Sequence, residues 1–477
     1  MTWTDITLTV QTPMFLGGVD LPGDVTTPSG GRPRPPTKVV FPVPSLRGAL
    51  RYWLRALVGA HLPPSREGLL TLADVERRVF GTASREEGGT PTPGDRSPAR
   101  RSPSTVIIRS RELVPFVRPY GPASQLDDAQ EEETPGGRGT RRTGRGQGGR
   151  GGNYKDKDRE AGGTVTYLLG QGLFQDKKLV VGHVPAGCKI RLAVRLDGHA
   201  DDQSAVGDLL IASLWALATF GGLGQRARRG FGTVAVKVDD VVDLPARRFS
   251  TIFLSKPVEE DAAAKLRLVL GGVRLVLADL GVEHLPVGAP RLLDGSGGPL
   301  PPDYPCFRPG RYLLADDVPE RPARDVDAAL RYVAGQLRGF RANGEPSAAD
   351  QPRSQDYVEV IGPWLDGTLP SPEQALDNSA LGLPTGYARP VSGGKPDTAM
   401  VSPRLDGAEI RRASPLWLRP YPSGDGWHLR SLAFLDRFLP DGATLVLTGE
   451  RAGQSIDPHV MPAPTQADVD SRLREWF

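Results

Sequence analysis

The sequence predicts an α+β protein whose first half has the ferredoxin-like order strand, helix, strand, strand, helix, strand. Polar and apolar residues alternate in short runs, and two apolar runs with helical spacing separate these runs in the required order. The predicted strands are residues 4–10, 104–113, 188–196 and 231–238, and the predicted helices are residues 45–60 and 208–220. A break near residues 243–250 precedes a second α+β domain.

The first predicted helix, SLRGALRYWLRALVGA, combines an apolar face with a basic stripe. Ser45 is the expected N-cap. Three arginines recur every four residues and form a stripe roughly 80° wide beside the apolar face. Because their mutual repulsion is unfavourable unless an anion meets them, the stripe is either a solvated basic face or a phosphate contact. The apolar face consists of Leu46, Leu50, Trp53, Leu54 and Leu57, and the stripe of Arg47, Arg51 and Arg55.

A glycine- and arginine-rich loop, FGGLGQRARRGFGTV, spans residues 220–234. Part of it matches the dinucleotide pattern G-x-G-x-x-A, but that pattern requires a strand before it and a helix after it. Here a helix precedes and a strand follows, so the sequence predicts no nucleotide cofactor. Glycine allows a close backbone approach, and arginine grips phosphate oxygens bidentately. The loop is therefore either a phosphate contact or a solvated turn.

The second half predicts helices at residues 259–280, 325–341 and 466–476. Strands are expected at residues 410–421, with an interruption at a proline, and then within WHLRSLAFL and ATLVLTG. Residues 342–356 and 385–404 are expected to be loops. The order of the strands in this domain stays open.

Two segments have the composition of flexible insertions. Residues 85–103 are rich in Gly, Pro, Arg and Glu, and residues 118–163 join an acidic patch to the run GGRGTRRTGRGQGGRGG. Because almost no large apolar side chain is present there, burial does not offset the entropy of ordering. The run from Arg138 to Gly152 either binds RNA through disordered arginines or has no role.

The composition limits the classes of function. Net charge is only +3 over 477 residues, so any polyanion site depends on local clustering. The two cysteines, Cys188 and Cys306, are far apart, and neither Cys-x-x-Cys nor His-Glu-x-x-His occurs, so we expect no disulfide framework and no metal site. No signal pattern and no apolar run of about 18 residues is apparent. We therefore expect a cytoplasmic protein with no membrane contact.

Catalytic constellations are scarce. The six histidines are scattered along the chain, and no nucleophile elbow, P-loop or paired-carboxylate motif occurs. His61, just after the arginine helix, is the candidate for a general acid or base, but a histidine at a helix end beside the C-terminal dipole is the commoner situation. The sequence thus favours a protein that is not an enzyme.

The helix SLRGALRYWLRAL and the loop GGLGQRARRGFGTV together resemble the RAMP proteins of CRISPR effector complexes. The stretches TLTVQTPMFLGG, RRVFGTAS and STVIIRS resemble in particular the first-numbered RAMP subunit of the type III-B (Cmr) complex. In the second half, ALGLPTGY and RRASPLWLRP also resemble that family.

This resemblance implies two tandem ferredoxin-like domains, here residues 1–246 and 247–477, and a non-catalytic subunit without cofactor. It implies as partners the 3′ part of the crRNA, its paired target RNA and other RAMP subunits, in antiviral defence. The residues implied in RNA binding are Arg47, Arg51, Arg55, Gly222, Gly224, Arg226, Arg228, Arg229, Gly230, Arg411 and Arg412. Two alternatives are an endoribonuclease that processes crRNA precursors through His61, and a purely structural subunit whose arginines face acidic partner proteins.

Overall fold

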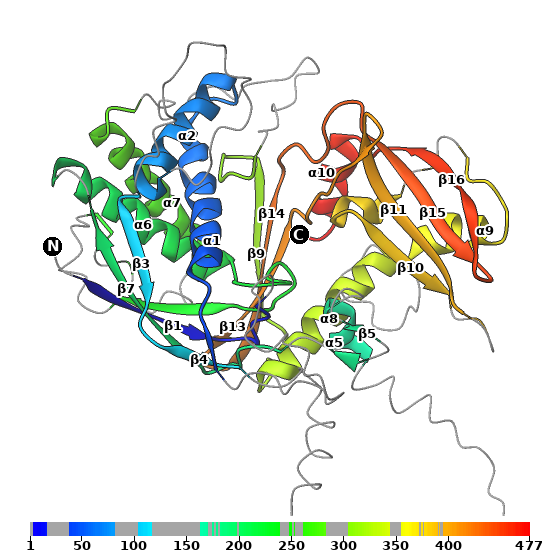
Figure 1. Cartoon of the computed structure of the whole chain (residues 1–477), viewed down its shortest axis with the longest axis horizontal. Coiled ribbons are helices and arrows are strands. Elements are labelled where there is room, and N and C mark those ends of the chain that lie inside the picture. The colour runs from blue at the N-terminus through cyan, green and yellow to red at the C-terminus, as the bar shows by residue number, and fades with distance from the viewer. Residues whose placement is uncertain are drawn as a thin grey trace, which may run out of the picture.

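The computed structural model describes most of both predicted domains (Figure 1). The described residues are 3–16, 38–81, 104–116, 163–169, 174–175, 178–179, 182–197, 200–238, 248–249, 252, 261–282, 304–343, 354–371, 374, 376–389, 391 and 395–477. The predicted insertions at residues 85–103 and 118–163 lie outside these residues, except for Gly163, with which a helix begins.

The N-terminal domain has the predicted ferredoxin-like topology. Its antiparallel sheet has the order β3-β7-β1-β8, which is the order that a strand–helix–strand–strand–helix–strand chain forms in this fold. The strands are β1 (Thr4–Val10), β3 (Val106–Ser110), β7 (Lys189–Leu196) and β8 (Val234–Val238). One face of the sheet is covered by α1 (Val43–Val58) and α6 (Ala200–Phe220), which pack against each other (Figure 1).

Further short elements surround this domain. Two more helices pack beside α1 and α6, and two small strands pair below the sheet. These elements are α2 (Arg66–Phe80), α7 (Ala262–Asp279), β2 (Lys38–Val40), β4 (Leu113–Pro115), the 3-10 turn η1 (Gly59–His61), α5 (Gly163–Leu169), β5 (Phe174–Gln175) and β6 (Lys178–Leu179). Because α7 packs against α6, it lies with the N-terminal domain in space; the predicted boundary at residues 246 and 247 stays a prediction.

The residues around Pro42 determine where helix α1 begins. The expected N-cap, Ser45, is wrong: the helix begins at Val43 after Pro42, and Pro44 lies in its first turn. Proline fits there because the first N–H groups of a helix have no intrahelical acceptor. The apolar face is confirmed, since all five of its predicted residues are at most 1% exposed.

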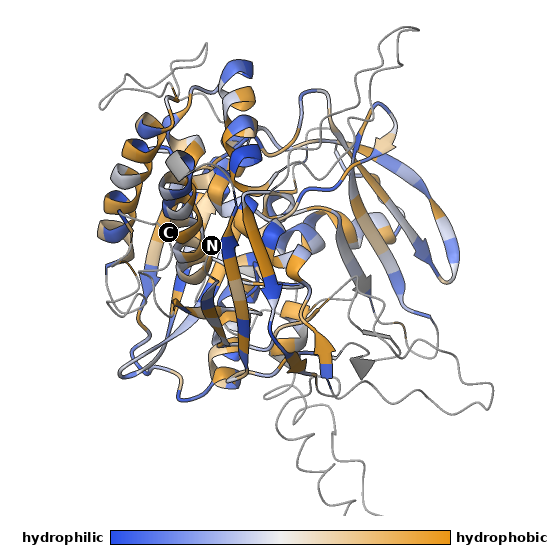
Figure 2. Cartoon of the chain, turned by 60° about the vertical axis from the view of Figure 1, so that its left-hand side comes forward, coloured by the Kyte–Doolittle hydropathy of each residue, from blue (hydrophilic) through white to orange (hydrophobic). Residues whose placement is uncertain are grey.

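Helix α6 is the central core helix. The sequence suggested no apolar run as long as a membrane span, yet residues Asp202–Phe220 are apolar and long enough to qualify, and 89% of that stretch is buried in the protein. Its aromatic residues Trp215 and Phe220 meet Trp53 of α1 in one cluster. Figure 2 shows hydrophobic residues running along the helices and strands of this domain. The apolarity of α6 thus reflects its position between α1 and the sheet.

The second domain contains a sheet with part of the same strand topology. Its three-stranded sheet has the order β13-β14-β9, the same relative order as β3-β7-β1 in the first sheet. The elements are β9 (Tyr312–Asp317), α8 (Val326–Asn343), β13 (Leu416–Ser423) and β14 (Gly426–Phe434). The strand predicted at residues 410–421 therefore begins later, at Leu416.

A five-stranded antiparallel sheet lies beside this unit. Its order is β10-β11-β15-β16, with β12 paired to β11. The strands are β10 (Thr385–Arg389), β11 (Asp397–Leu405), β12 (Ala408–Glu409), β15 (Thr444–Arg451) and β16 (Gln454–Pro462). The loop predicted at residues 385–404 is therefore wrong. Asp397 and Pro403 disfavour a strand locally, but pairing on both sides of β11 overrides that preference.

Short helical elements complete the second domain. The predicted C-terminal helix is confirmed, and a capping box between Thr465 and Asp468 sets its start. These elements are the π-helix η5 (Tyr357–Ile361), α9 (Gly362–Leu365), the 3-10 turn η6 (Asp377–Leu381) and α10 (Gln466–Arg474).

Two buried arginines of the second domain join it to the first. Arg419 of β13 donates to the carbonyl oxygens of Gly221 (2.9 Å) and Val234 (3.1 Å). Arg430 of β14 donates to the carbonyl of Thr219 (3.5 Å) and pairs with Asp316 (2.6 Å). Both arginines are 1% exposed. The ends of α6 and β8 are therefore held from the second domain.

We predict that Arg419→Met lowers the free energy of unfolding by about 3 kcal/mol, because it leaves buried carbonyl oxygens without a donor. Arg404→Met, on the exposed side of β11, is the matched control and should change it by less than about 0.5 kcal/mol. Urea unfolding of both variants measures the difference. Equal losses would show that Arg419 does not hold the junction.

Candidate nucleic-acid interface

A cleft of about 1620 Å³ lies between the two domains. One wall is the glycine- and arginine-rich loop, here residues 222–229, together with the start of α1. The opposite wall is formed by residues 381–386 and 411–418 of the second domain, and Leu337 and Arg341 of α8 close one end. The loop and the second domain are joined directly, because Leu418 N donates to Arg228 O (3.0 Å).

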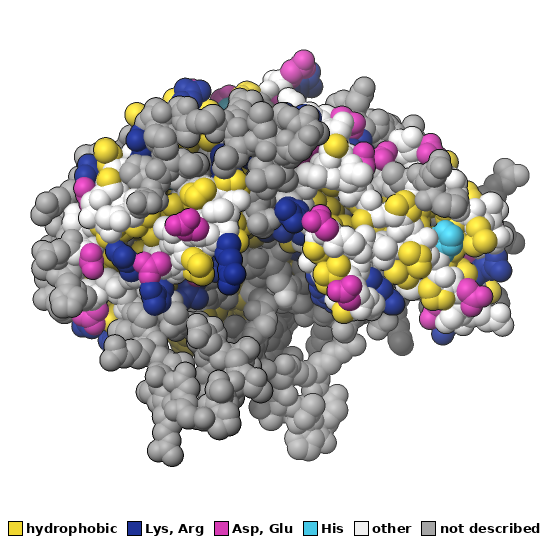
Figure 3. Space-filling model, turned by 90° about the horizontal axis from the view of Figure 1, so that it is seen from above, with side chains coloured by type: hydrophobic (Ala, Val, Ile, Leu, Met, Phe, Trp, Pro, Cys, Tyr) yellow, Lys and Arg dark blue, Asp and Glu magenta, His cyan; other side chains and the backbone are white. Residues whose placement is uncertain are grey.

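The charged side chains on this cleft have one sign. Among the described residues that line it there is no Asp, Glu or Lys. Its six arginines are Arg226, Arg228, Arg229, Arg341, Arg411 and Arg412. By contrast, the face of the molecule in Figure 3 mixes basic and acidic side chains over both domains. Positive charge is therefore concentrated in the cleft, although the net charge of the chain is only +3.

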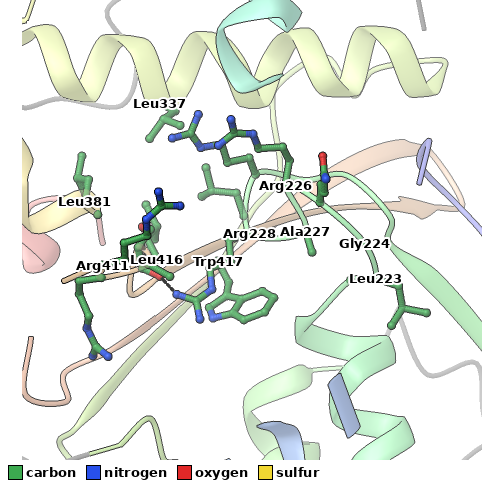
Figure 4. A pocket seen from close by; sticks show the side chains of 18 of the residues that line it. Leu223, Gly224, Arg226, Ala227, Arg228, Leu337, Leu381, Arg411, Leu416 and Trp417 are labelled. Carbon is green, nitrogen blue, oxygen red and sulfur yellow. Dashed lines mark hydrogen bonds between the residues drawn. The ribbon is translucent and has the colours of Figure 1, made fainter. Parts of the chain in front are cut away.

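Arg228 is held in place by contacts from both domains. Its guanidinium lies over the Trp417 ring (4.8 Å) and donates to Ser414 O (Figure 4). Trp417 Nε1 in turn donates to the hydroxyl of Tyr52 (3.1 Å). Burial raises the pKa of Tyr52 to about 12, so this phenol stays neutral. None of these contacts neutralises Arg228, so a fixed positive charge faces the cleft.

Arg226 and Arg229 lie next to each other in the turn. Arg229 N donates to Arg226 O (2.8 Å), and Arg229 Nη1 donates to Leu168 O (3.2 Å). The pKa of Arg229 is lowered to about 9, first by burial and then by the charges of Arg341 and Arg226. Burial also lowers the pKa of Arg226. This end of the cleft therefore holds cations that repel one another.

The two residues of the predicted pair, Arg411 and Arg412, have different roles. Arg412 forms an ion pair with the buried carboxylate of Asp436 and donates to Arg437 O (3.0 Å). Arg411 is exposed at the mouth of the cleft (Figure 4), and none of the described hydrogen bonds or ion pairs involves it. Arg411 is thus available to a ligand, whereas the charge of Arg412 is used within the domain.

The protein's own packing requires glycine at the predicted loop positions. A Cβ on Gly224 would lie 2.3 Å from Phe15 O, and one on Gly222 would lie 2.8 Å from Phe231 O. Gly230 is outside the cleft lining and lies against Pro420 of β13. Gly222 and Gly224 do line the cleft, but the side without a Cβ faces the chain itself. That these glycines let the loop lie against RNA stays a prediction.

The arginine stripe of α1 does not reach the cleft. Arg47 donates to Val106 O (2.9 Å), and Arg51 donates to Phe80 O (3.1 Å) and Gly81 O (2.8 Å) at the end of α2. Arg55 forms a bidentate pair with Glu76. The anion that the stripe requires is therefore supplied by α2. The structure does not bring these three residues together with the other predicted RNA-binding residues.

Two cleft residues were missed by the sequence analysis. Arg341 ends the predicted helix at residues 325–341, where its spacing is that of an ordinary helix-surface cation. Tyr167 lies in α5, beside α8 (Figure 1). Only the pairing of the two helices places them on the cleft. No local pattern in the sequence predicts that either residue lines a cleft.

The candidate acid–base residue lies elsewhere. His61 is in η1 and is not part of the cleft lining. Within the described parts of the chain, no group of three or more His, Cys, Asp or Glu side chains is arranged to hold a metal ion.

The N-terminal half of the chain matches the family model described as the RAMP superfamily, over residues 7–235. The matched residues contain most of the ferredoxin-like sheet and the glycine- and arginine-rich loop. No curated protein sequence matches the chain.

Several solved structures are similar to the whole chain at low sequence identity. Apo Cmr1 from Pyrococcus furiosus is 16% identical, covers 92% of this chain and 90% of its own, and has a TM-score of 0.46. A chain of a type III-B Cmr-β complex bound to cognate target RNA and AMPPnP is 11% identical, with 99% and 98% covered and a TM-score of 0.42. A chain of Cmr-β bound to cognate target RNA is 13% identical, with 91% and 94% covered and a TM-score of 0.39.

We predict that Arg51→Ala destabilises the protein but leaves nucleic-acid affinity unchanged. The variant removes the donor that caps the last carbonyls of α2, at a cost of about 1–2 kcal/mol. Arg411→Ala should show the opposite pattern, because Arg411 is exposed in the cleft. Thermal unfolding and binding titrations on both variants test this. A weaker affinity of Arg51→Ala for nucleic acid would indicate that the arginine stripe is part of the interface.

Proposed function

We propose that this chain is a cytoplasmic, non-catalytic RNA-binding subunit of a type III-B CRISPR ribonucleoprotein that acts in antiviral defence. The observation that carries the proposal is the cleft between the domains, which has six arginines and no acidic residue among its described lining. Residues 7–235, which match the RAMP superfamily, contain one wall of this cleft and support the assignment.

The chemistry of the cleft suits the sugar–phosphate backbone. Guanidinium groups bind phosphate oxygens through paired N–H donors. Contacts to phosphates position a strand without reading its sequence. A subunit that holds guide RNAs of many different sequences requires this property, since base pairing supplies the specificity. The proposed ligands are the 3′ part of the crRNA and the target RNA paired with it.

The rigidity of the cleft also favours binding. Arg228 is fixed between Trp417 and Ser414, so little side-chain entropy is lost when a phosphate arrives. Arg226 and Arg411, which are less constrained, follow the backbone of the strand on either side. In this proposal the RNA-contacting residues are Arg226, Arg228, Arg229 and Arg411. Arg412 positions the segment that carries Arg411, through its pair with Asp436.

The two alternative functions receive less support. A precursor-processing endoribonuclease would need an acid–base group beside the bound phosphate, and His61 does not line the cleft. A purely structural subunit would use its arginines against acidic proteins, but a concave cleft favours a narrow polyanion over a flat protein surface. Other RAMP subunits of the complex remain proposed partners at surfaces outside the cleft.

We predict that Arg411→Ala weakens binding of unrelated single-stranded RNAs by a similar factor. The slope of log K against log salt should fall by about 0.7, the value for one phosphate contact with a single strand. Arg404→Ala is the matched control, because Arg404 is also exposed but lies outside the cleft. Fluorescence anisotropy at several salt concentrations measures both variants. A loss confined to one RNA sequence would contradict backbone recognition.

We also predict that the protein cleaves neither precursor nor target RNA by itself. Labelled RNAs incubated with the purified chain, with and without magnesium, should remain intact. His61→Ala serves as the diagnostic variant. Specific cleavage by the wild-type protein that disappears in His61→Ala would establish the processing function instead.

A further inference from the structure

Three guanidinium groups from both domains meet at one end of the cleft. Arg226 and Arg229 come from the loop of the N-terminal domain, and Arg341 comes from α8 of the second domain. Their charges act on one another, since Arg341 and Arg226 both lower the pKa of Arg229. Figure 4 shows Arg226 extending toward Leu337, which lies one helical turn before Arg341 on α8.

The described contacts of these three arginines do not neutralise them. Arg229 donates to the carbonyl of Leu168, and Arg341 Nη1 donates to the hydroxyl of Tyr167 (3.3 Å). The buried Nε of Arg341 has no hydrogen-bond acceptor. Burial disfavours the charge of Arg341, but Tyr167, Tyr387 and the carboxylate of Asp356 act against burial, so the pKa of Arg341 is raised. The carboxylate of Asp356 also accepts from Asn378 N (3.1 Å) and the Tyr387 hydroxyl (3.3 Å). Clustered cations of this kind are unfavourable unless an anion joins them.

The backbone at Arg226 supports a role in binding. Its φ is 62°, in the left-handed region where a non-glycine residue costs about 1 kcal/mol. The neighbouring turn positions Gly224 and Gly230 also have positive φ but are glycines. None of the described hydrogen bonds or ion pairs involves the Arg226 side chain. An arginine in this conformation is therefore explained better by a ligand than by the fold.

We propose that Arg226, Arg229 and Arg341 form a phosphate-binding subsite that links the two domains. The proposal rests on the proposed function, which supplies RNA as the source of the phosphate. Either an internal phosphodiester or a terminal phosphate of the strand has the required chemistry. Because the three cations come from both domains, a bound phosphate relieves their repulsion and stabilises the junction.

The first experiment uses inorganic phosphate and the full chain, without RNA. Phosphate should raise the melting temperature by about 1–2 °C when it exceeds its Kd tenfold, relative to chloride at the same ionic strength. Arg341→Gln should lose this rise. Arg331→Gln, on the same helix α8 but outside the cleft lining, should keep it. An equal response of wild type and Arg341→Gln would overturn the proposal.

Arg226→Gly provides a second, independent test of the same subsite. The variant should lose the phosphate response, yet its melting temperature without phosphate should exceed that of Arg226→Ala, because glycine adopts the observed φ without strain. If Arg226→Gly retains the full phosphate response, Arg226 is not part of the subsite and the proposal fails.

RNA oligonucleotides with either a hydroxyl or a phosphate at each end identify the source of the phosphate. A terminal phosphate that raises affinity several-fold in wild type, but not in Arg341→Gln, identifies a strand end. An equal loss for all oligonucleotides identifies an internal phosphodiester. If Arg411→Ala weakens RNA binding while Arg341→Gln does not, the subsite fails but the proposed function stands. If wild type binds no RNA yet responds to phosphate, the proposed function fails instead.

Discussion

The architecture depends on how Arg419 holds both stems of the glycine- and arginine-rich loop. This buried side chain of β13 donates to Gly221 O, where α6 ends, and to Val234 O, where β8 begins. It also donates to the side chain of Gln11 (2.9 Å). A cation that belongs to the second domain thus fixes the two points between which the first domain's loop must turn. The loop, the cleft wall and the domain junction consequently depend on the same contacts of Arg419.

Arginine serves two physically distinct purposes in this chain. Arg430 with Asp316 and Arg412 with Asp436 are pairs in which a carboxylate offsets the charge, and they hold strands and loops together. The arginines of the loop instead donate to carbonyl oxygens or stack on aromatic rings. These contacts fix a guanidinium in space and leave its charge in place. Together with Arg411 at the cleft, this second class explains how a chain of net charge +3 holds a basic cleft.

The sequence predicted the first domain well because its information is local. The burial pattern of β1 and the helical spacing of α1 are visible within short windows, and six such elements in order define the topology. The strands β10 and β11 were missed: β11 pairs on one side with the distant β15, and β10 pairs only with β11. The cleft was predicted in part: Arg226, Arg228, Arg229 and Arg411 stand in recognisable stretches, whereas Arg341 joins them only through the packing of α8. Contacts between distant segments leave no signal in a single sequence.

The arginine stripe of α1 shows that charge in the sequence alone does not predict a binding surface. The premise was physically correct, since cations spaced every four residues do require an anion. The chain supplies one such anion, Glu76, which pairs with Arg51 and Arg55, while Arg47 donates to Val106 O of β3. The loop arginines have the same residue type and a similar density, but no acidic residue is among the described lining of the cleft, and Asp436, whose charge acts on Arg228, is paired with Arg412. A basic surface is therefore available to an anionic ligand when the protein's own carboxylates do not offset the charge of its arginines. Folding pairs Arg51 and Arg55 with a carboxylate, whereas Arg228 and Arg229 pair by backbone with β13 and turn their side chains into the cleft.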